Sequence, residues 1–135
     1  MIRCKRVYEP AAADDGQRVL VDRLWPRGVS KAALEPYIWR KDAAPSSELR
    51  QWYGHEPARF DEFARRYRTE LLAHPEHWLA LLDMARKGNL TLLYAARPTV
   101  CDHAHVLADL LESELARDGE SSSPVCYAAQ FPTPT

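Results

Sequence analysis

The chain has 135 residues, of which 46% are hydrophobic and 27% are charged, and its formal net charge is −1. This composition fits one globular domain with a sizeable core, and the balanced charge gives no global attraction to nucleic acid or anionic membranes. No apolar run approaches membrane-spanning length, no signal peptide opens the chain, and the three cysteines have no C-x-x-C spacing, so we expect a cytoplasmic protein without disulfides.

Short strands and rigid turns occupy the first 40 residues. Residues 2–7 predict a first strand near a sheet edge. Residues 18–24 predict a second strand, and its continuous apolar centre indicates burial on both faces. Ser30 is a suitable cap for a short helix to residue 34. Residues 37–39 fit either a short strand or an extended segment.

Helical patterns dominate the middle of the chain. Ser46 predicts the start of a short helix, which Gly54 ends. Pro57 and Pro75 each suit the first turn of a further helix, and Gly88 predicts the end of the second of these. The helix after Pro57 has an apolar stripe at helical spacing, formed by Phe60, Phe63, Ala64, Tyr67 and Leu71.

The order of these elements predicts an α/β fold. A strand over residues 90–96 and a final helix beginning near Asp102 complete the pattern. Long crossovers favour parallel pairing, so we expect a single three-layer domain over residues 1–117 with a mainly parallel sheet flanked by helices on both faces, Rossmann-like in the broad sense. Residues 118–135 begin with the polar run DGESSSP and predict a flexible C-terminal extension, in which only residues 125–129 are expected to dock.

Polar clusters follow both apolar strands. In a parallel sheet both would lie beyond the same edge, where ligands of such sheets bind. Arg23, Arg27 and Arg97 could form a clamp for an anion, because guanidinium binds carboxylate or phosphate through two parallel hydrogen bonds. The alternative is that these arginines are surface residues or pair with Asp22 or Asp102.

The same clusters contain candidates for catalysis. Asp22 could act as a general acid or base where it closes a buried strand, and His103 could shuttle protons beside Asp102. Trp25 could stack on a planar ligand. The structural alternatives are that Asp22 holds loop N–H groups and that Asp102 caps the last helix.

Other motifs for chemistry are weak. Cys101 precedes a helix as a reactive thiolate would, but the arginine that a phosphatase loop needs six positions later is replaced by Leu107. His74 and His77 could share a helix face, yet no third ligand is evident, and we expect no metal. Without G-x-G-x-x-G or a P-loop motif, we also expect no cofactor.

A run of arginines suggests a second hypothesis. Arg65, Arg66 and Arg68 resemble a nucleic-acid patch, but acidic residues interleave with them, so a solvated helix face is favoured. The polar clusters that follow the two apolar strands support the favoured hypothesis, a site for an anionic, phosphate- or nucleotide-like small molecule, with or without catalysis. The alternative is a non-catalytic module that binds protein or nucleic acid.

The segments IRCKRVYEP, RVLVDRLWPRG, APSSELRQWYGHEPARFDEFARRY and LTLLYAAR, in this order, resemble the YeaO-like family of the domain of unknown function 488. The resemblance implies a small cytoplasmic bacterial α/β protein with no established activity. Signature positions carried onto this chain are Asp22, Arg23, Trp25, Pro26, Arg27, Gly28, Trp52, Gly54, His55, Tyr94, Ala95, Ala96 and Arg97. The chain departs from the family pattern at Cys101-Asp102-His103, where relatives usually have asparagine, and in an extension after Arg117.

Overall fold

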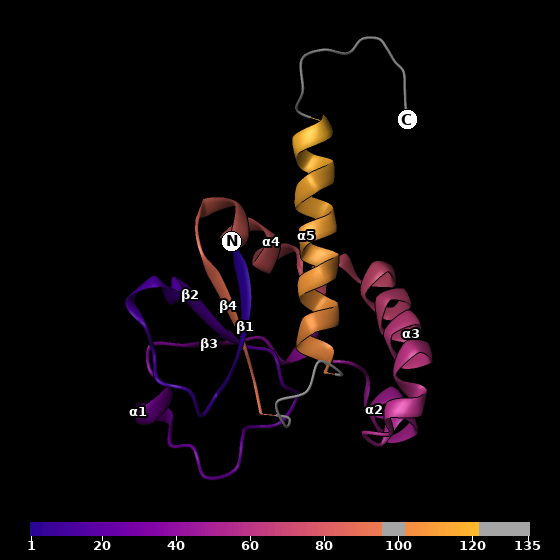
Figure 1. Cartoon of the computed structure of the whole chain (residues 1–135), viewed down its shortest axis with the longest axis horizontal. Coiled ribbons are helices and arrows are strands. Elements are labelled where there is room, and N and C mark those ends of the chain that lie inside the picture. Colours follow the sequence, from indigo (N-terminus) through magenta and orange to yellow (C-terminus); the bar gives the residue numbers. More distant parts are fainter. Residues whose placement is uncertain (96–101, 122–135) are drawn as a thin grey trace.

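The computed structural model describes residues 1–95 and 102–121, with the backbone alone for 118–121. Its centre is a four-stranded sheet in the order β1-β4-β2-β3, formed by β1 (Ile2–Arg6), β2 (Gln17–Leu20), β3 (Ile38–Trp39) and β4 (Leu90–Tyr94) (Figure 1). All three pairings are parallel. The predicted α/β class and the edge position of the first strand are confirmed, and residues 37–39 contain a strand.

The helices follow the predicted order. They are α1 (Lys31–Leu34), α2 (Ser47–Tyr53), α3 (Phe60–Ala73), α4 (Leu79–Lys87) and α5 (His103–Ser121). Ser30 and Ser46 cap α1 and α2 through their hydroxyl groups, and Gly54 ends α2 in the left-handed region at φ 53°. In the described part of the chain, no helix is long and apolar enough to cross a membrane.

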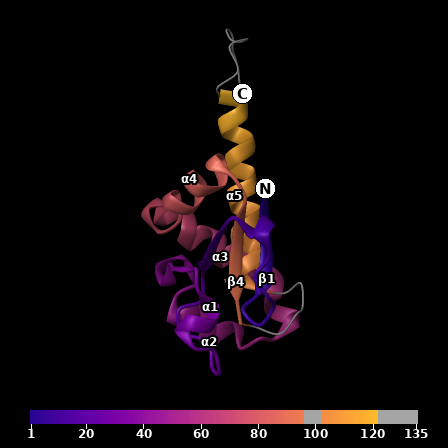
Figure 2. The same ribbon diagram turned by 90° about the vertical axis from the view of Figure 1, so that its left-hand side faces the viewer.

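The end of α5 projects beyond the other elements in both views (Figures 1 and 2). The helix continues to Ser121, past residue 117, where the sequence predicted the end of the domain. The rest of the predicted extension, residues 122–135, lies outside the described residues.

The main core lies between the sheet and the helices α3, α4 and α5. Leu90, Leu92 and Tyr94 of β4 face this core, as expected for alternate positions of a strand. The predicted stripe of α3 is also confirmed, since Phe63 and Tyr67 are fully packed among core residues. This packing holds the start of α5 against the ends of β2 and β4.

The opposite face of the sheet is covered differently. A small cluster of Val7, Leu20, Leu34 and Leu93 packs beneath the one-turn helix α1 and the loop that contains Trp25. The expected flanking helix is therefore reduced on this face to a single turn and a loop. Asp15 and its ion-pair partners form another part of this face.

The turn before β2 is unusually tight. Gly16 has φ 66°, and a Cβ atom at this position would lie 2.2 Å from the backbone oxygen of Asn89. That same oxygen accepts a hydrogen bond from the backbone N–H of Gln17 at 3.0 Å. Glycine is required here because a side chain would collide with the backbone that pairs with β2.

Candidate functional site

A pocket of about 540 Å³ lies beyond the carboxyl ends of β2 and β4. One wall is the segment from Asp22 to Pro26, and another is the end of α2. Ala95 and the first residues of α5 complete the lining. Five predicted site residues line this pocket together: Asp22, Arg23, Trp25, Asp102 and His103. Their proximity agrees with the expectation that both polar clusters lie at the same sheet edge.

Asp22 connects three elements at this edge. Its Oδ2 accepts a hydrogen bond from the backbone N–H of Ala95 at 2.9 Å, which ties the end of β2 to the end of β4. Its Oδ1 lies 3.3 Å from Nε2 of His103 at the start of α5. Asp22 and His103 thus form a close pair, with each side chain 16% exposed.

The contacts of His103 define the tautomer of its ring. Nε2 lies 3.0 Å from the carbonyl oxygen of Val21 as well as 3.3 Å from Asp22. A carbonyl oxygen can only accept, so Nε2 carries a hydrogen. In the neutral ring, Nδ1 then holds the lone pair and can accept a hydrogen bond. The sequence predicted His103 beside Asp102, but the structure pairs it with Asp22.

Arg23 binds backbone carbonyl groups. Its Nε donates to the oxygen of Pro45 at 3.2 Å, and one terminal nitrogen donates to the oxygen of Ala44 at 3.3 Å. Neither of the carboxylate pairings considered from the sequence forms at Arg23 within the described residues. Because guanidinium has five N–H donors, Arg23 keeps further donors while it holds the segment before α2.

Trp25 fixes the loop that follows β2. Its indole N–H donates to the oxygen of Val29 at 2.6 Å, and its ring makes edge contacts with Tyr37 and Trp39, both at 5.3 Å between centroids. The indole also lines the pocket. These contacts make Trp25 a rigid wall, because both the polar and the aromatic parts of its side chain are held.

Asp102 caps α5, which confirms the structural alternative for this residue. Its Oδ1 accepts the backbone N–H of His105 at 3.0 Å, and its Oδ2 lies 2.7 Å from Nδ1 of the same residue. Asp102 is buried, with 3% of its surface exposed. Both oxygens are therefore engaged within the helix, as is usual for an N-cap aspartate.

The predicted clamp of three arginines is not assembled by the described residues. Arg27 is exposed and does not line the pocket, although its backbone oxygen accepts a hydrogen bond from Tyr8. Arg97 and Cys101 lie outside the described residues.

Two basic residues that were not named as site candidates also line the pocket. They are Arg50 and His55, from the end of α2. His55 has φ 57°, which a residue other than glycine adopts at a cost of roughly 1–2 kcal/mol. The only signal for His55 in the sequence was the signature string WYGH, and nothing marked Arg50.

Cys4 in β1 is partly buried and packs against the main core. Burial raises the pKa of its thiol to about 12, and the negative charges of Asp102 and Asp109 add to this rise. The thiol therefore stays protonated at neutral pH, and a protonated thiol is a poor nucleophile.

Two arginines of α3 share one glutamate of the same helix. Arg65 and Arg66 both bind Glu62, at 2.5 and 2.8 Å. Their hydrogen bonds lower the pKa of Glu62 to about 2. Arg65 and Arg66 follow Glu62 by three and four residues, the spacing at which side chains on a helix meet. Arg66 also lies over the ring of Trp52, 4.3 Å from its centroid.

Residues 1–128 match the family model described as "Inactive DUF488-N3 subclade". The chain belongs to this family. It is 48% identical to the uncharacterized protein YeaO of Escherichia coli K12 over 112 residues, which cover 83% of this chain and 97% of that protein. It is 51% identical over 111 residues to the uncharacterized proteins Rv3073c of Mycobacterium tuberculosis and Mb3100c of Mycobacterium bovis, covering 82% of this chain and 92% of each. No solved structure gives a significant match.

The resemblance inferred from the DRLWPRG and WYGH strings is thus confirmed. The family match also extends past Arg117, where the sequence predicted an extension beyond the usual family end.

Proposed function

We propose that the pocket beyond β2 and β4 binds an anionic, phosphate- or nucleotide-like small molecule without transforming it. The observation that carries this proposal is the convergence of Arg23, Arg50 and the Asp22–His103 pair on one pocket. Charged groups of this kind fix the orientation of a ligand, while the surrounding apolar walls exclude water.

The charge balance of the pocket supports an anionic ligand. Both lining carboxylates already have a partner, since Asp22 lies beside His103 and Asp102 binds His105. Arg50 is exposed at the pocket, and Arg23 keeps donors that its carbonyl contacts do not use. An added phosphate or carboxylate would thus meet guanidinium groups, which bind such groups in a planar, two-point geometry.

The size of the pocket supports a ligand larger than a simple ion. Its volume of about 540 Å³ falls within the range of small-molecule sites. The buried ring of Tyr53 stacks on Phe63 at 4.2 Å, and both residues belong to the lining. The pocket therefore combines an aromatic wall with cationic groups, a combination that suits an organic anion.

Asp22 and His103 act as positioning residues in this proposal. Asp22 holds Nε2 of His103, which leaves Nδ1 as an acceptor for a hydroxyl or N–H group of the ligand. The description of the matched subclade as inactive favours binding over turnover.

Matched ligands test the proposal directly. We would titrate the protein with adenosine monophosphate, adenosine, inorganic phosphate and citrate by isothermal titration calorimetry at low ionic strength. We expect the monophosphate to bind and adenosine to bind at least about tenfold more weakly, because the charged group supplies about 1.4 kcal/mol or more. Equal binding of adenosine monophosphate and adenosine would contradict an anion site, as would absence of binding by all four compounds.

Variants then locate the binding. Arg50→Gln should weaken binding of the monophosphate about fivefold, since an exposed charge contributes roughly 1 kcal/mol. Arg86→Gln is the matched control, because Arg86 is an exposed arginine near the end of α4, before β4 begins at the opposite sheet edge. Equal losses in both variants would show that the effect is non-specific screening.

A further inference from the structure

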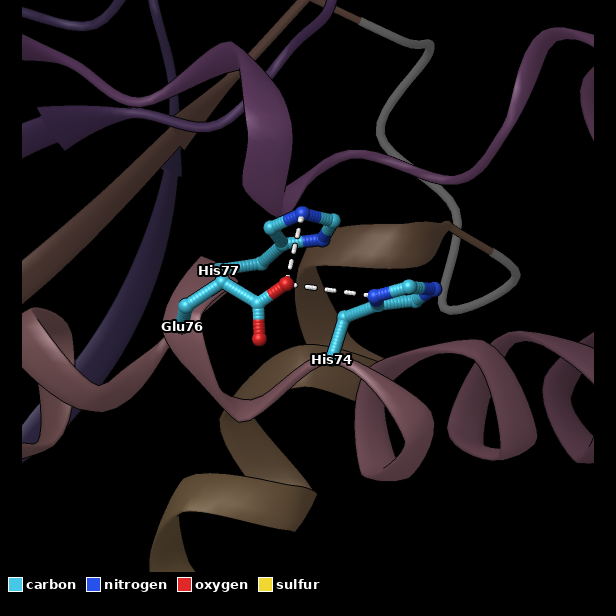
Figure 3. A group of neighbouring side chains, drawn as sticks. All are labelled: His74, Glu76 and His77. Atoms are coloured by element: carbon cyan, nitrogen blue, oxygen red, sulfur yellow. Dashed lines mark hydrogen bonds and ion pairs between the residues drawn. The ribbon is translucent and has the colours of Figure 1, made fainter.

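Three side chains converge at the turn between α3 and α4. Nδ1 of His74 lies 3.2 Å from Oε2 of Glu76, and Nε2 of His77 lies 3.7 Å from the same oxygen. Figure 3 shows the carboxylate of Glu76 beside both imidazole rings, with dashed lines from one of its oxygens to a nitrogen of each. Two imidazole nitrogens and a carboxylate oxygen thus face a common space.

The separations of these atoms suit a small metal ion. The three ligating atoms all lie within 4.8 Å of one another. A tetrahedral zinc ion with bonds of about 2.1 Å holds its ligand atoms about 3.4 Å apart. The two distances to Glu76, 3.2 and 3.7 Å, are already close to this value.

The backbone of this turn is firmly held. Pro75 begins a short 3₁₀ turn, in which the N–H of His77 donates to the oxygen of His74 and the N–H of Trp78 donates to that of Pro75, both at 3.0 Å. Trp78 is buried and donates its indole N–H to the oxygen of Leu71 at 2.7 Å. The backbone positions of the three residues are therefore set by the fold before any ion binds, which lowers the entropic cost of binding.

We propose that His74, Glu76 and His77 form a site for a divalent transition-metal ion, with zinc as the probe. Imidazole and carboxylate are ligands that zinc accepts, and imidazole also suits copper and nickel. Three protein ligands leave a fourth position for water or for a group of another molecule. None of the three residues lines the pocket beyond β2 and β4, so the metal site is independent of the proposed anion binding.

The sequence pattern already placed His74 and His77 near each other but supplied no third ligand. The third ligand is Glu76, which lies between the two histidines in the sequence. In an α-helix the middle residue of such a group would point away from the other two. The 3₁₀ turn that begins at Pro75 and the non-helical backbone of His74, with φ −134° and ψ 70°, bring all three side chains to one side.

The full-length protein tests this site by calorimetric titration with zinc and by visible absorption with cobalt as a spectroscopic substitute. We expect one zinc ion per chain and cobalt bands of a site with nitrogen and oxygen ligands. His77→Ala and Glu76→Gln should each weaken zinc binding at least about tenfold, since even changes around metal ligands cost 10- to 100-fold. The side chains of His74, His77 and Glu76 are 56%, 33% and 66% exposed, so these variants should fold normally.

A matched control removes a histidine elsewhere. His55→Asn keeps a residue that tolerates φ 57° and should leave zinc binding unchanged. The proposal would be overturned by absence of zinc binding in the unaltered protein, or by equal affinity in the His77→Ala variant. A cobalt–thiolate band that persists in His77→Ala would assign the metal to cysteine and would also overturn it.

Discussion

Asp15 and Asp22 lie at opposite ends of strand β2, and their surroundings differ. Asp15 precedes β2, where Nζ of Lys5 binds its carboxylate at 3.1 Å and Nε of Arg18 lies 3.5 Å away. Asp22 follows β2, where it pairs with His103 beside a pocket. The side chain of Asp15 is 1% exposed and that of Asp22 is 16% exposed.

The difference separates a structural ion pair from a candidate site. The charge of Asp15 is satisfied by cations on its own sheet and by the backbone N–H of Ala12 at 3.0 Å. Asp15 does not line the pocket beyond β2 and β4. Asp22 joins β2, β4 and α5 but remains at the wall of a cavity. An internally satisfied, enclosed carboxylate holds the fold, whereas one that is paired at an open edge can also face a ligand.

Loss of the Asp15 carboxylate should have the largest effect on stability. Asp15→Ala would leave Lys5 and Arg18 without their buried counter-charge, and we expect the free energy of unfolding to fall by about 3–5 kcal/mol. Urea unfolding followed by circular dichroism measures this change. Asp14→Ala is the matched control, because Asp14 is exposed and its carboxylate pairs with the partly exposed Arg3, so its loss should cost less than about 1 kcal/mol. Similar losses in both variants would contradict the structural role of Asp15.

The same carboxylate should control stability in acid. Burial alone would raise the pKa of Asp15, but the hydrogen bonds from Ala12 and Lys5 and the nearby cations lower it below its ordinary value of 3.8. A lowered folded-state pKa means that Asp15 contributes stability above about pH 4 and that this contribution disappears as the pH falls through the folded-state pKa.

This expectation is checked by measuring the urea concentration at the midpoint of unfolding at pH values from 7 to 2.5. Asp15→Asn should flatten the acid side of the stability profile, whereas the exposed control Asp14→Asn should retain it. An unchanged acid slope in Asp15→Asn would assign the acid sensitivity to other carboxylates.

Asp22 should matter less to stability than Asp15. Asp22→Asn keeps an oxygen that can accept the N–H of Ala95 and loses only the charge facing His103. We therefore expect a loss of about 1 kcal/mol in unfolding free energy, together with weaker binding of adenosine monophosphate. A loss as large as that of Asp15→Ala would show that both aspartates are primarily structural.

The last prediction concerns the chemical reactivity of the Cys4 thiol, and it involves no expected change in stability. Its pKa of about 12 predicts very slow alkylation by iodoacetamide at pH 8. The measurement uses the Cys101→Ser, Cys126→Ser double variant, in which Cys4 is the remaining cysteine. We expect rapid modification only after unfolding in urea. Equal rates in the folded and unfolded chain would contradict the burial of this thiol.

Local signals predicted the parts of this fold that depend on local interactions. Ser30 and Ser46 cap helices, and Gly54 ends one, because each position requires a particular hydroxyl or a left-handed backbone. The parallel sheet followed from the long connections between apolar strands. The convergence of Asp22 and His103 at one edge then followed from the direction of the strands.

The remaining features depend on contacts that are distant in the sequence. The second strand ends at Leu20 and not at residue 24, because the side chain of Asp22 takes the N–H of Ala95 in place of further strand pairing. Arg23 bonds carbonyl oxygens near α2, and His103 bonds Asp22 and not Asp102. The angle at which α2 and α5 approach the sheet decides these partners, and no local pattern encodes it.

The contrast between the two aspartates is the central claim, and amide chemical shifts test it most directly. Adenosine monophosphate would be titrated into ¹⁵N-labelled protein at low ionic strength. We predict saturable shifts at Asp22, Arg23 and His103, with unaffected resonances at Lys5 and Arg18. Shifts confined to Lys5 and Arg18, or no saturable shifts at the pocket, would contradict the account.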